Sequence, residues 1–152
     1  MQPSATLFDE RLTAPRSWWV IAFGAGIACA LMFLPLGTVP LLAGLAGGTA
    51  ASAVVVSSYG SARIRVVAGA LVAGDARIPL SALGEAEALD AESARAWRSH
   101  RADPRAFMLL RSYIPTAVRV EVADPADPTP YVFLSTREPQ ALVAALTAVR
   151  AA

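Results

Sequence analysis

Residues 17–62 contain no Asp, Glu, Lys, Arg or His, and an arginine stands at each end of this stretch. The hydrocarbon core of a bilayer is about 30 Å thick and is crossed by roughly 20 apolar residues in a helix. The stretch is therefore long enough for two passes joined by a tight turn. Charged residues make up 16% of the whole chain, below the roughly 25% typical of soluble proteins. We expect two membrane-spanning helices within residues 17–59.

The connector between these helices is predicted at residues 34–40, which contain Pro35, Gly37 and Pro40 and no charge. The first helix then runs from Ser17 to about residue 34 and the second from about residue 41 to 57. Tryptophan side chains favour the membrane interface. Trp18 and Trp19 are therefore expected at headgroup level at the start of the first helix.

Arginines flank both ends of this hairpin and are absent from its connector. Arg11 and Arg16 precede it, and Arg63 and Arg65 follow it. The positive-inside rule then predicts a plasma-membrane protein with two spans and with the N-terminus and the C-terminus both in the cytoplasm.

Small residues recur every four positions in both predicted spans. They are Ala22, Gly26 and Ala30 in the first, and Gly44 and Gly48 in the second. This spacing lets helices approach closely, and we favour packing within the hairpin over a dimerisation face. The spans contain no ionisable residue, which argues against a transporter or channel.

After the hairpin, polar and apolar residues alternate as in strands exposed on one face. We predict strands at 63–66, 71–73, 77–80, 106–110, 117–122 and 131–136. Pro79 favours an edge strand because it cannot donate a ladder hydrogen bond. Residues 85–89 suit either a fourth strand or a helix, and Asp90 is predicted to cap a short helix over 91–97.

The C-terminal part is predicted to contain a hairpin loop and a final helix. The proline-rich stretch 124–130 has the composition of a turn between two strands. Thr136 is expected to cap the following helix, with Pro139 in its first turn. An apolar stripe then follows at helical spacing: Leu142, Val143, Leu146 and Val149.

The predicted domain consists of short strands followed by one amphipathic helix, and residues 74–81 contain a Gly-Asp turn and the sequence Ile-Pro-Leu-Ser. This pattern resembles the bacterial pleckstrin-homology-like domains that follow membrane helices. This resemblance implies an open β-barrel or sheet closed by a C-terminal helix. The expected fold class is a membrane α-hairpin plus a small α+β domain. The expected domains are a cytoplasmic N-terminal segment 1–16, a transmembrane hairpin 17–59 and a cytoplasmic domain 60–152.

Several short segments also resemble a family of actinobacterial two-helix membrane proteins known as domain of unknown function 3093. The segments are 10–12, 15–19, 118–122, 124–131 and 135–139. The most specific are Asp-Pro-Ala-Asp-Pro-Thr-Pro-Tyr at 124–131 and Ser-Thr-Arg-Glu-Pro at 135–139. The resemblance covers nearly the whole chain, and it implies a membrane location without implying an activity.

Catalytic and cofactor motifs are absent from the sequence. His100 and Cys29 are the single histidine and cysteine, so a His/Cys metal site cannot be assembled. There is no Gly-x-Ser-x-Gly nucleophile motif and no glycine-rich phosphate loop. We expect no catalytic residues, no metal and no cofactor. Nucleic-acid binding is disfavoured because the net charge is only +1 and such binding needs a concentrated basic field.

The candidate binding residues are Asp124, Asp127, Tyr131, Arg137 and Arg111. The two aspartates precede prolines, where turn formation is favoured over cation binding. Arg137 lies near the start of the final helix and is expected either to pair with Asp127 in an exposed ion pair or to bind a phosphate or carboxylate. Tyr131 is favoured as a core or rim aromatic.

Three hypotheses about function follow. The first is a non-enzymatic binding or scaffold module at the inner face of the plasma membrane, with a membrane or cytoplasmic protein or a lipid headgroup as partner. The second is an auxiliary subunit that acts through its transmembrane hairpin. The third is an enzyme with an unrecognised site.

Overall fold

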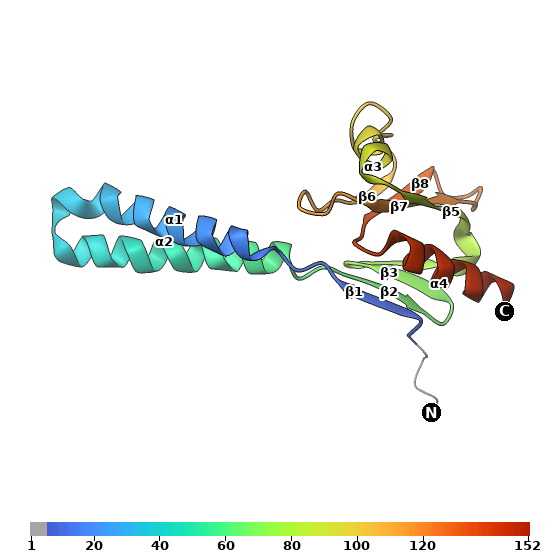
Figure 1. The fold of residues 1–152 in the computed structure, drawn as a ribbon, viewed down its shortest axis with the longest axis horizontal. Coiled ribbons are helices and arrows are strands. Elements are labelled where there is room, and N and C mark those ends of the chain that lie inside the picture. The colour runs from blue at the N-terminus through green and yellow to red at the C-terminus, as the bar shows by residue number, and fades with distance from the viewer. Residues whose placement is uncertain (1–5) are drawn as a thin grey trace. The chain divides into compact units, whose positions relative to one another are not determined.

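The computed structural model describes residues 6–152, and these divide into two compact units. Residues 13–62 form a helical hairpin, which we call the hairpin unit. Residues 6–12 and 63–152 form an α+β unit rich in strands, which we call the sheet unit (Figure 1).

The hairpin unit consists of two long apolar helices. Helix α1 spans Arg16–Phe33, a single 3-10 turn spans Leu34–Leu36, and helix α2 spans Thr38–Tyr59. Both helices are long and apolar enough to cross a membrane. Helix α2 begins three residues earlier than the predicted residue 41, because a proline fits the first turn of a helix, where the backbone N–H has no acceptor. Gly37 makes the turn with φ 111°, a conformation that favours glycine.

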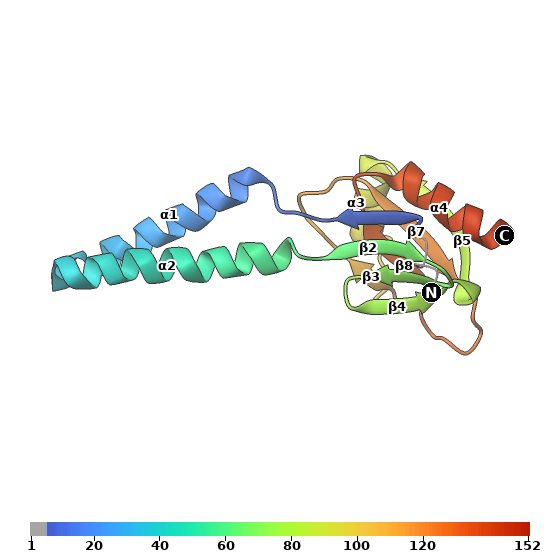
Figure 2. The same cartoon turned by 90° about the horizontal axis from the view of Figure 1, so that it is seen from below.

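Small residues bring α1 and α2 into close contact (Figure 1), and Figure 2 shows the two helices spreading apart toward the open end. Ala22, Gly26 and Ala30 are buried on α1, and Gly44 is buried on α2. A Cβ atom at Gly26 would lie 1.9 Å from Thr49 Oγ1, and one at Gly44 would lie 2.9 Å from the carbonyl oxygen of Cys29. The predicted packing within the hairpin is therefore confirmed. At the open end, the rings of Trp18 and Tyr59 stack 5.4 Å apart.

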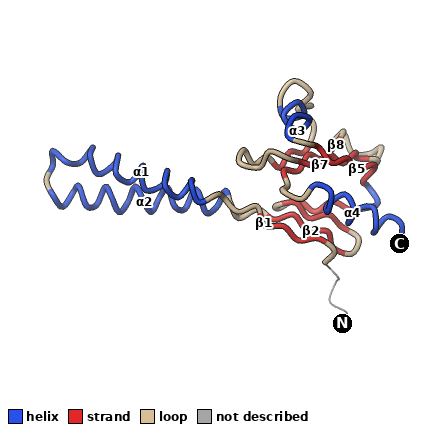
Figure 3. The backbone as a smooth tube through the Cα atoms, in the orientation of Figure 1, coloured by secondary structure: helices blue, strands red, loops and turns tan. Residues whose placement is uncertain are grey.

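The sheet unit contains two four-stranded sheets (Figure 3). The first sheet has the order β1-β2-β3-β4, with strands Phe8–Arg11, Arg63–Val67, Ala70–Ala73 and Ala76–Pro79. The second has the order β5-β7-β8-β6, with strands Leu83–Leu89, Ala117–Val122, Tyr131–Ser135 and Phe107–Leu109. All pairs are antiparallel except β6 with β8, which is parallel.

Most predicted strands are confirmed, and the alternating pattern explains them. In β2, Ile64 and Val66 are buried while Arg63 and Arg65 are exposed. Strand β4 lies at an edge, as Pro79 predicted. The helical alternative for residues 85–89 is wrong, since these residues belong to β5 and pair with β7.

Two helices complete the sheet unit. Helix α3 spans Ala91–Arg98, and the predicted cap is confirmed because Asp90 Oδ1 accepts the Ser93 N–H at 2.7 Å. Helix α4 spans Pro139–Ala151 and contacts strands of both sheets, as Figure 1 shows. Its side chains Leu142 and Leu146 are buried.

Strand β1 was not indicated by the sequence pattern. Its four residues pair in full register with β2, from Phe8 opposite Val66 to Arg11 opposite Arg63. The N-terminal part of the chain, as far as it is described, thus contributes a strand to the sheet unit. The hairpin unit is a 50-residue insertion, residues 13–62, between two paired strands.

Candidate functional site

A polar cluster centred on the buried Thr136 joins β1 to the chain between β8 and α4. The carboxylate of Glu10 accepts hydrogen bonds from the Thr136 hydroxyl and, at 3.0 Å, from the Arg137 backbone N–H. Thr116 Oγ1 donates to the Thr136 carbonyl oxygen at 2.6 Å. We call Glu10, Thr116, Thr136 and Arg137 the Glu10 junction. It joins residues from two of the segments that carried the family resemblance, 10–12 and 135–139.

Thr136 has a different role from the one predicted. The N-cap of α4 is Glu138, so the prediction that Thr136 caps this helix is wrong. The Thr136 hydroxyl instead donates to Glu10 and accepts the Glu138 N–H at 3.1 Å. Thr136 itself is 0% exposed. The carboxylate and the hydroxyl together link β1 to the chain that leads into α4.

Tyr113 extends this connection to the end of β1. Its hydroxyl donates to the Leu12 carbonyl oxygen at 2.6 Å, and the Leu12 side chain is fully buried. The guanidinium of Arg137 lies 5.8 Å from the centre of the Tyr113 ring, within the range of a cation–π contact. Arg137 is exposed, so its guanidinium is the part of the junction that a ligand could contact.

Asp124 and Asp127 shape the loop between β7 and β8. Asp124 Oδ1 accepts the Ala126 N–H at 2.9 Å, and Asp127 Oδ1 accepts the Thr129 N–H at 2.9 Å. The hydrogen bond from Thr129 lowers the pKa of Asp127 below 3.8. These contacts are the side-chain-to-backbone bonds of a turn, and they support the turn-forming interpretation of both residues.

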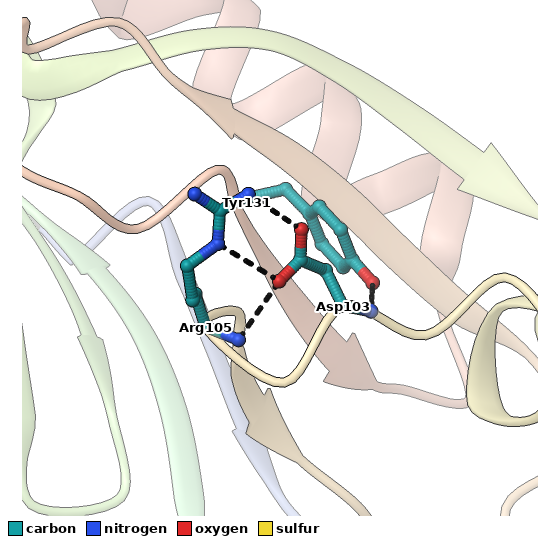
Figure 4. A network of polar contacts seen from close by, with 3 residues as sticks. All are labelled: Asp103, Arg105 and Tyr131. Carbon is teal, nitrogen blue, oxygen red and sulfur yellow. Dashed lines mark hydrogen bonds and ion pairs between the residues drawn. The ribbon is translucent and has the colours of Figure 1, made fainter.

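Tyr131 lies in the core of the second sheet and not on a surface. It is 5% exposed, and its hydroxyl accepts the Asp103 N–H at 2.9 Å. Figure 4 shows the Asp103 carboxylate turned toward Arg105, 2.9 Å away. The hydrogen bond from Arg105 lowers the pKa of Asp103. This group secures the loop after α3 to strand β8.

A second cluster, which sequence reasoning missed, lies beside Tyr131. The Trp97 ring meets the Tyr131 ring edge-on at 5.2 Å, and the Arg119 guanidinium lies 4.6 Å from the Trp97 ring centre. Arg119 also pairs with Glu87 at 3.2 Å and Glu121 at 3.5 Å. Strand alternation in β7 places Arg119 and Glu121 on one face, but only the pairing of β5 with β7 brings Glu87 to them.

Arg111 lies close to the Glu10 junction. Its backbone N–H donates to Ser135 Oγ at 3.1 Å, and its guanidinium donates to the Leu110 carbonyl oxygen at 2.7 Å. The candidate residues therefore occupy separate places: Arg111 and Arg137 lie next to the two ends of the segment Ser135–Thr136, the aspartates lie in the exposed loop, and Tyr131 lies in the core.

A pocket of about 330 Å³ with a partly polar lining lies in the sheet unit. Its lining consists of Ala88, Leu89, Asp90, Ser93, Thr116, Pro139 and Gln140. Thr116 is the only residue of the Glu10 junction in this lining, and the lining contains none of the candidate binding residues. Within residues 6–152, no group of three or more His, Cys, Asp or Glu side chains is placed to hold a metal ion.

Comparison with known families identifies the family to which the chain belongs. A family model described as "Protein of unknown function (DUF3093)" matches residues 7–146. The chain belongs to this family. The DUF3093 match includes β1, the whole hairpin unit and most of α4, and so covers every residue of the Glu10 junction. No curated protein and no solved structure matches the chain.

Proposed function

We propose that this DUF3093 chain is an integral membrane protein whose hairpin unit crosses the plasma membrane twice and whose sheet unit is a non-enzymatic binding module at the cytoplasmic face. The sheet unit then acts by holding a partner next to the bilayer. We also propose that this unit is pleckstrin-homology-like, which its short strands and the contacts of α4 with both sheets support.

The proposed membrane topology rests on the pairing of β1 with β2. The hairpin unit leaves the sheet unit after β1 and returns to it at β2, the neighbouring strand. Both ends of a membrane hairpin inserted in this way must lie on one side of the bilayer. The arginines near these ends, with none in the connector, favour the cytoplasmic side.

The surface of the hairpin unit supports insertion. Large apolar side chains point outward along both helices: Val20 is 72% exposed, Met32 73% and Val39 78%. Soluble proteins rarely leave contiguous apolar surfaces of this extent exposed to water. Trp18, Trp19 and Tyr59 lie at the end that carries the flanking arginines, where aromatic residues meet headgroups.

Cysteine labelling of the full-length chain tests this topology. In a Cys29→Ser background, a single cysteine at Thr38 should react with an impermeant reagent added outside intact cells. A single cysteine at Ala152 should react only after the membrane is permeabilised. Labelling of position 152 in intact cells, or of neither position under any condition, would contradict the two-span cytoplasmic arrangement.

An apolar groove on the hairpin favours the second candidate, an auxiliary subunit that packs against another membrane protein. This groove, of about 440 Å³, is lined in part by Pro40, Ala43 and Gly47. A Cβ atom at Gly47 would meet no atom within 4 Å, so Gly47→Leu is expected to place its side chain in the groove without disturbing the contact between the two helices. Capture of a membrane partner that this variant abolishes would favour the auxiliary subunit over the binding module.

A further inference from the structure

The first sheet turns a row of arginines outward. Asp9 pairs with Arg65, Arg65 with Val72, and Val72 with Arg77, so these residues form one row across the outer face. Arg11 and Arg63 stand opposite each other in a neighbouring row. Figure 2 views this sheet from the side on which no other helix or strand of the sheet unit covers it. We call Arg11, Arg63, Arg65 and Arg77 the arginine face.

The arginine face is only partly neutralised by acidic residues of the chain. All four side chains are exposed, and none takes part in a salt bridge among the described residues 6–152. The acidic residues nearby are Asp9 in the same row and Asp75 in the turn between β3 and β4. Like charges directly opposite each other on paired strands are destabilising. Negative charge from outside the chain would therefore stabilise the Arg11–Arg63 pair.

Chain connectivity limits how far this face can lie from the membrane helices. Three residues, 60–62, separate the end of α2 at Tyr59 from Arg63. At about 3.8 Å per Cα–Cα step, Arg63 lies within about 15 Å of Tyr59. In the proposed topology, Tyr59 lies at the membrane interface. The covalent link therefore keeps the near end of the arginine face at most about 15 Å from the headgroup region.

We infer that the arginine face binds anionic phospholipid headgroups of the leaflet from which the hairpin emerges, an inference that rests on the proposed function. Guanidinium groups bind phosphate oxygens in a bidentate way. The anionic leaflet also has an advantage over an acidic protein, because the hairpin keeps it at high effective concentration beside the face. Each arginine at such a surface strengthens binding by about fivefold.

Lipid selectivity of the full-length chain tests this inference. The protein is reconstituted in phosphatidylcholine vesicles with a trace of spin-labelled phosphatidylglycerol or spin-labelled phosphatidylcholine, and the motionally restricted fraction of each label is measured. The chain should retain phosphatidylglycerol preferentially. Raising the salt from about 0.1 to 1 M shortens the Debye length from about 10 to 3 Å and should reduce this preference.

A matched pair of variants separates the arginine face from total charge. Arg65→Gln with Arg77→Gln removes two arginines of the face and leaves Arg11, Arg16 and Arg63 in place beside the spans. The control, Arg95→Gln with Arg101→Gln, removes the same charge from exposed positions on and after α3. The first variant should lower the phosphatidylglycerol preference several-fold, and the control should leave it unchanged.

Two results would overturn the inference: equal retention of the two lipids by correctly inserted wild-type protein, or equal losses in the two variants. Equal retention of the two lipids would mean that an acidic protein or solvent ions neutralise the arginine face. Equal losses in the two variants would indicate a non-specific effect of net charge. Cysteine labelling of the same samples distinguishes a failure of the proposed topology from a failure of lipid binding alone. Wrong topology refutes the proposed function, whereas correct topology without selectivity refutes only lipid binding. If the first variant fails to fold, the selectivity and salt dependence of the wild type decide.

Discussion

The hydroxyl of Tyr113 donates to the carbonyl oxygen of Leu12 at 2.6 Å and so joins residues 101 positions apart. Leu12 is the last residue of the sheet unit before the hairpin unit begins. Together with the Glu10 junction, this bond fixes the end of β1 through side chains, in addition to its backbone pairing with β2.

Tyr113→Phe removes this bond and leaves the aromatic ring in place. The Leu12 carbonyl oxygen then loses its partner, so the free energy of unfolding should fall by about 1–2 kcal/mol. Denaturant unfolding of the full-length protein in detergent, followed by near-UV circular dichroism, measures this change. An unchanged midpoint would show that water replaces the tyrosine hydroxyl at no cost.

Thr136→Val should destabilise the protein more, by about 2–3 kcal/mol, because it removes a donor to a carboxylate and an acceptor for the Glu138 N–H from a fully buried position. The control is Thr136→Ser, which keeps the hydroxyl and loses one methyl group, worth about 1 kcal/mol. Thr136→Val keeps this methyl group, so a loss in Thr136→Val no larger than that in Thr136→Ser would mean that the hydrogen bonds of the hydroxyl contribute little.

Leu146→Asp places a charge without a partner in the contact between α4 and the sheets. Leu146 is 2% exposed, so the substitution should cost about 3 kcal/mol or more and abolish cooperative unfolding of the sheet unit. Ala144→Asp on the exposed side of the same helix is the matched control and should have little effect. A normal transition in Leu146→Asp would show that α4 is dispensable to the core.

Asp124 and Asp127 are expected to shape the loop between β7 and β8 and not to bind a ligand. Asn accepts the same turn hydrogen bonds, so Asp124→Asn with Asp127→Asn should lower stability slightly and leave partner capture intact. Loss of capture at wild-type stability would identify the loop as a binding site.

The lowered pKa of Asp127 makes this prediction dependent on pH. A carboxyl group whose folded pKa lies below its ordinary value of 3.8 stabilises the fold above that value, and the contribution disappears as the pH falls through the folded pKa. Asparagine does not titrate. The stability difference between wild type and Asp127→Asn should therefore shrink below about pH 4, as thermal unfolding over a pH series would show.

Arg137→Ala tests the exposed part of the Glu10 junction. Loss of an exposed cation–π contact should cost about 1 kcal/mol or less, because the backbone N–H that binds Glu10 remains. Thermal unfolding and partner capture should be measured on the same sample. Normal stability with lost capture would assign ligand binding to this guanidinium.

Local patterns in the sequence predicted most elements of the fold. The uncharged stretch predicted the two helices of the hairpin, alternation predicted β2 and β7, and the capping residue Asp90 predicted the start of α3. The prolines of 124–130 predicted the turn between β7 and β8. In each case the determining residues are close together in the sequence.

The features that the sequence did not predict depend on contacts between residues that are far apart in the sequence. Strand β1 is short, and three of its four residues, Asp9, Glu10 and Arg11, are charged, so no apolar alternation marks it. It becomes a strand because β2 pairs with it across the 51 intervening residues 12–62. The Glu10 junction was missed for the same reason. Both of its segments carried the family resemblance, but only the tertiary structure places Glu10 against Thr136.

The insertion of the hairpin unit between β1 and β2 also sets the order of events during synthesis. Strand β1 leaves the ribosome first, and β2 follows only after residues 13–62 have been translated, which takes about 3–10 s at ordinary elongation rates. For a hairpin inserted as we propose, β1 waits without its partner until both helices have entered the bilayer. Slow synthesis or slow insertion of the hairpin would therefore prolong the time during which β1 has an unpaired edge, to which a strand of another chain can pair.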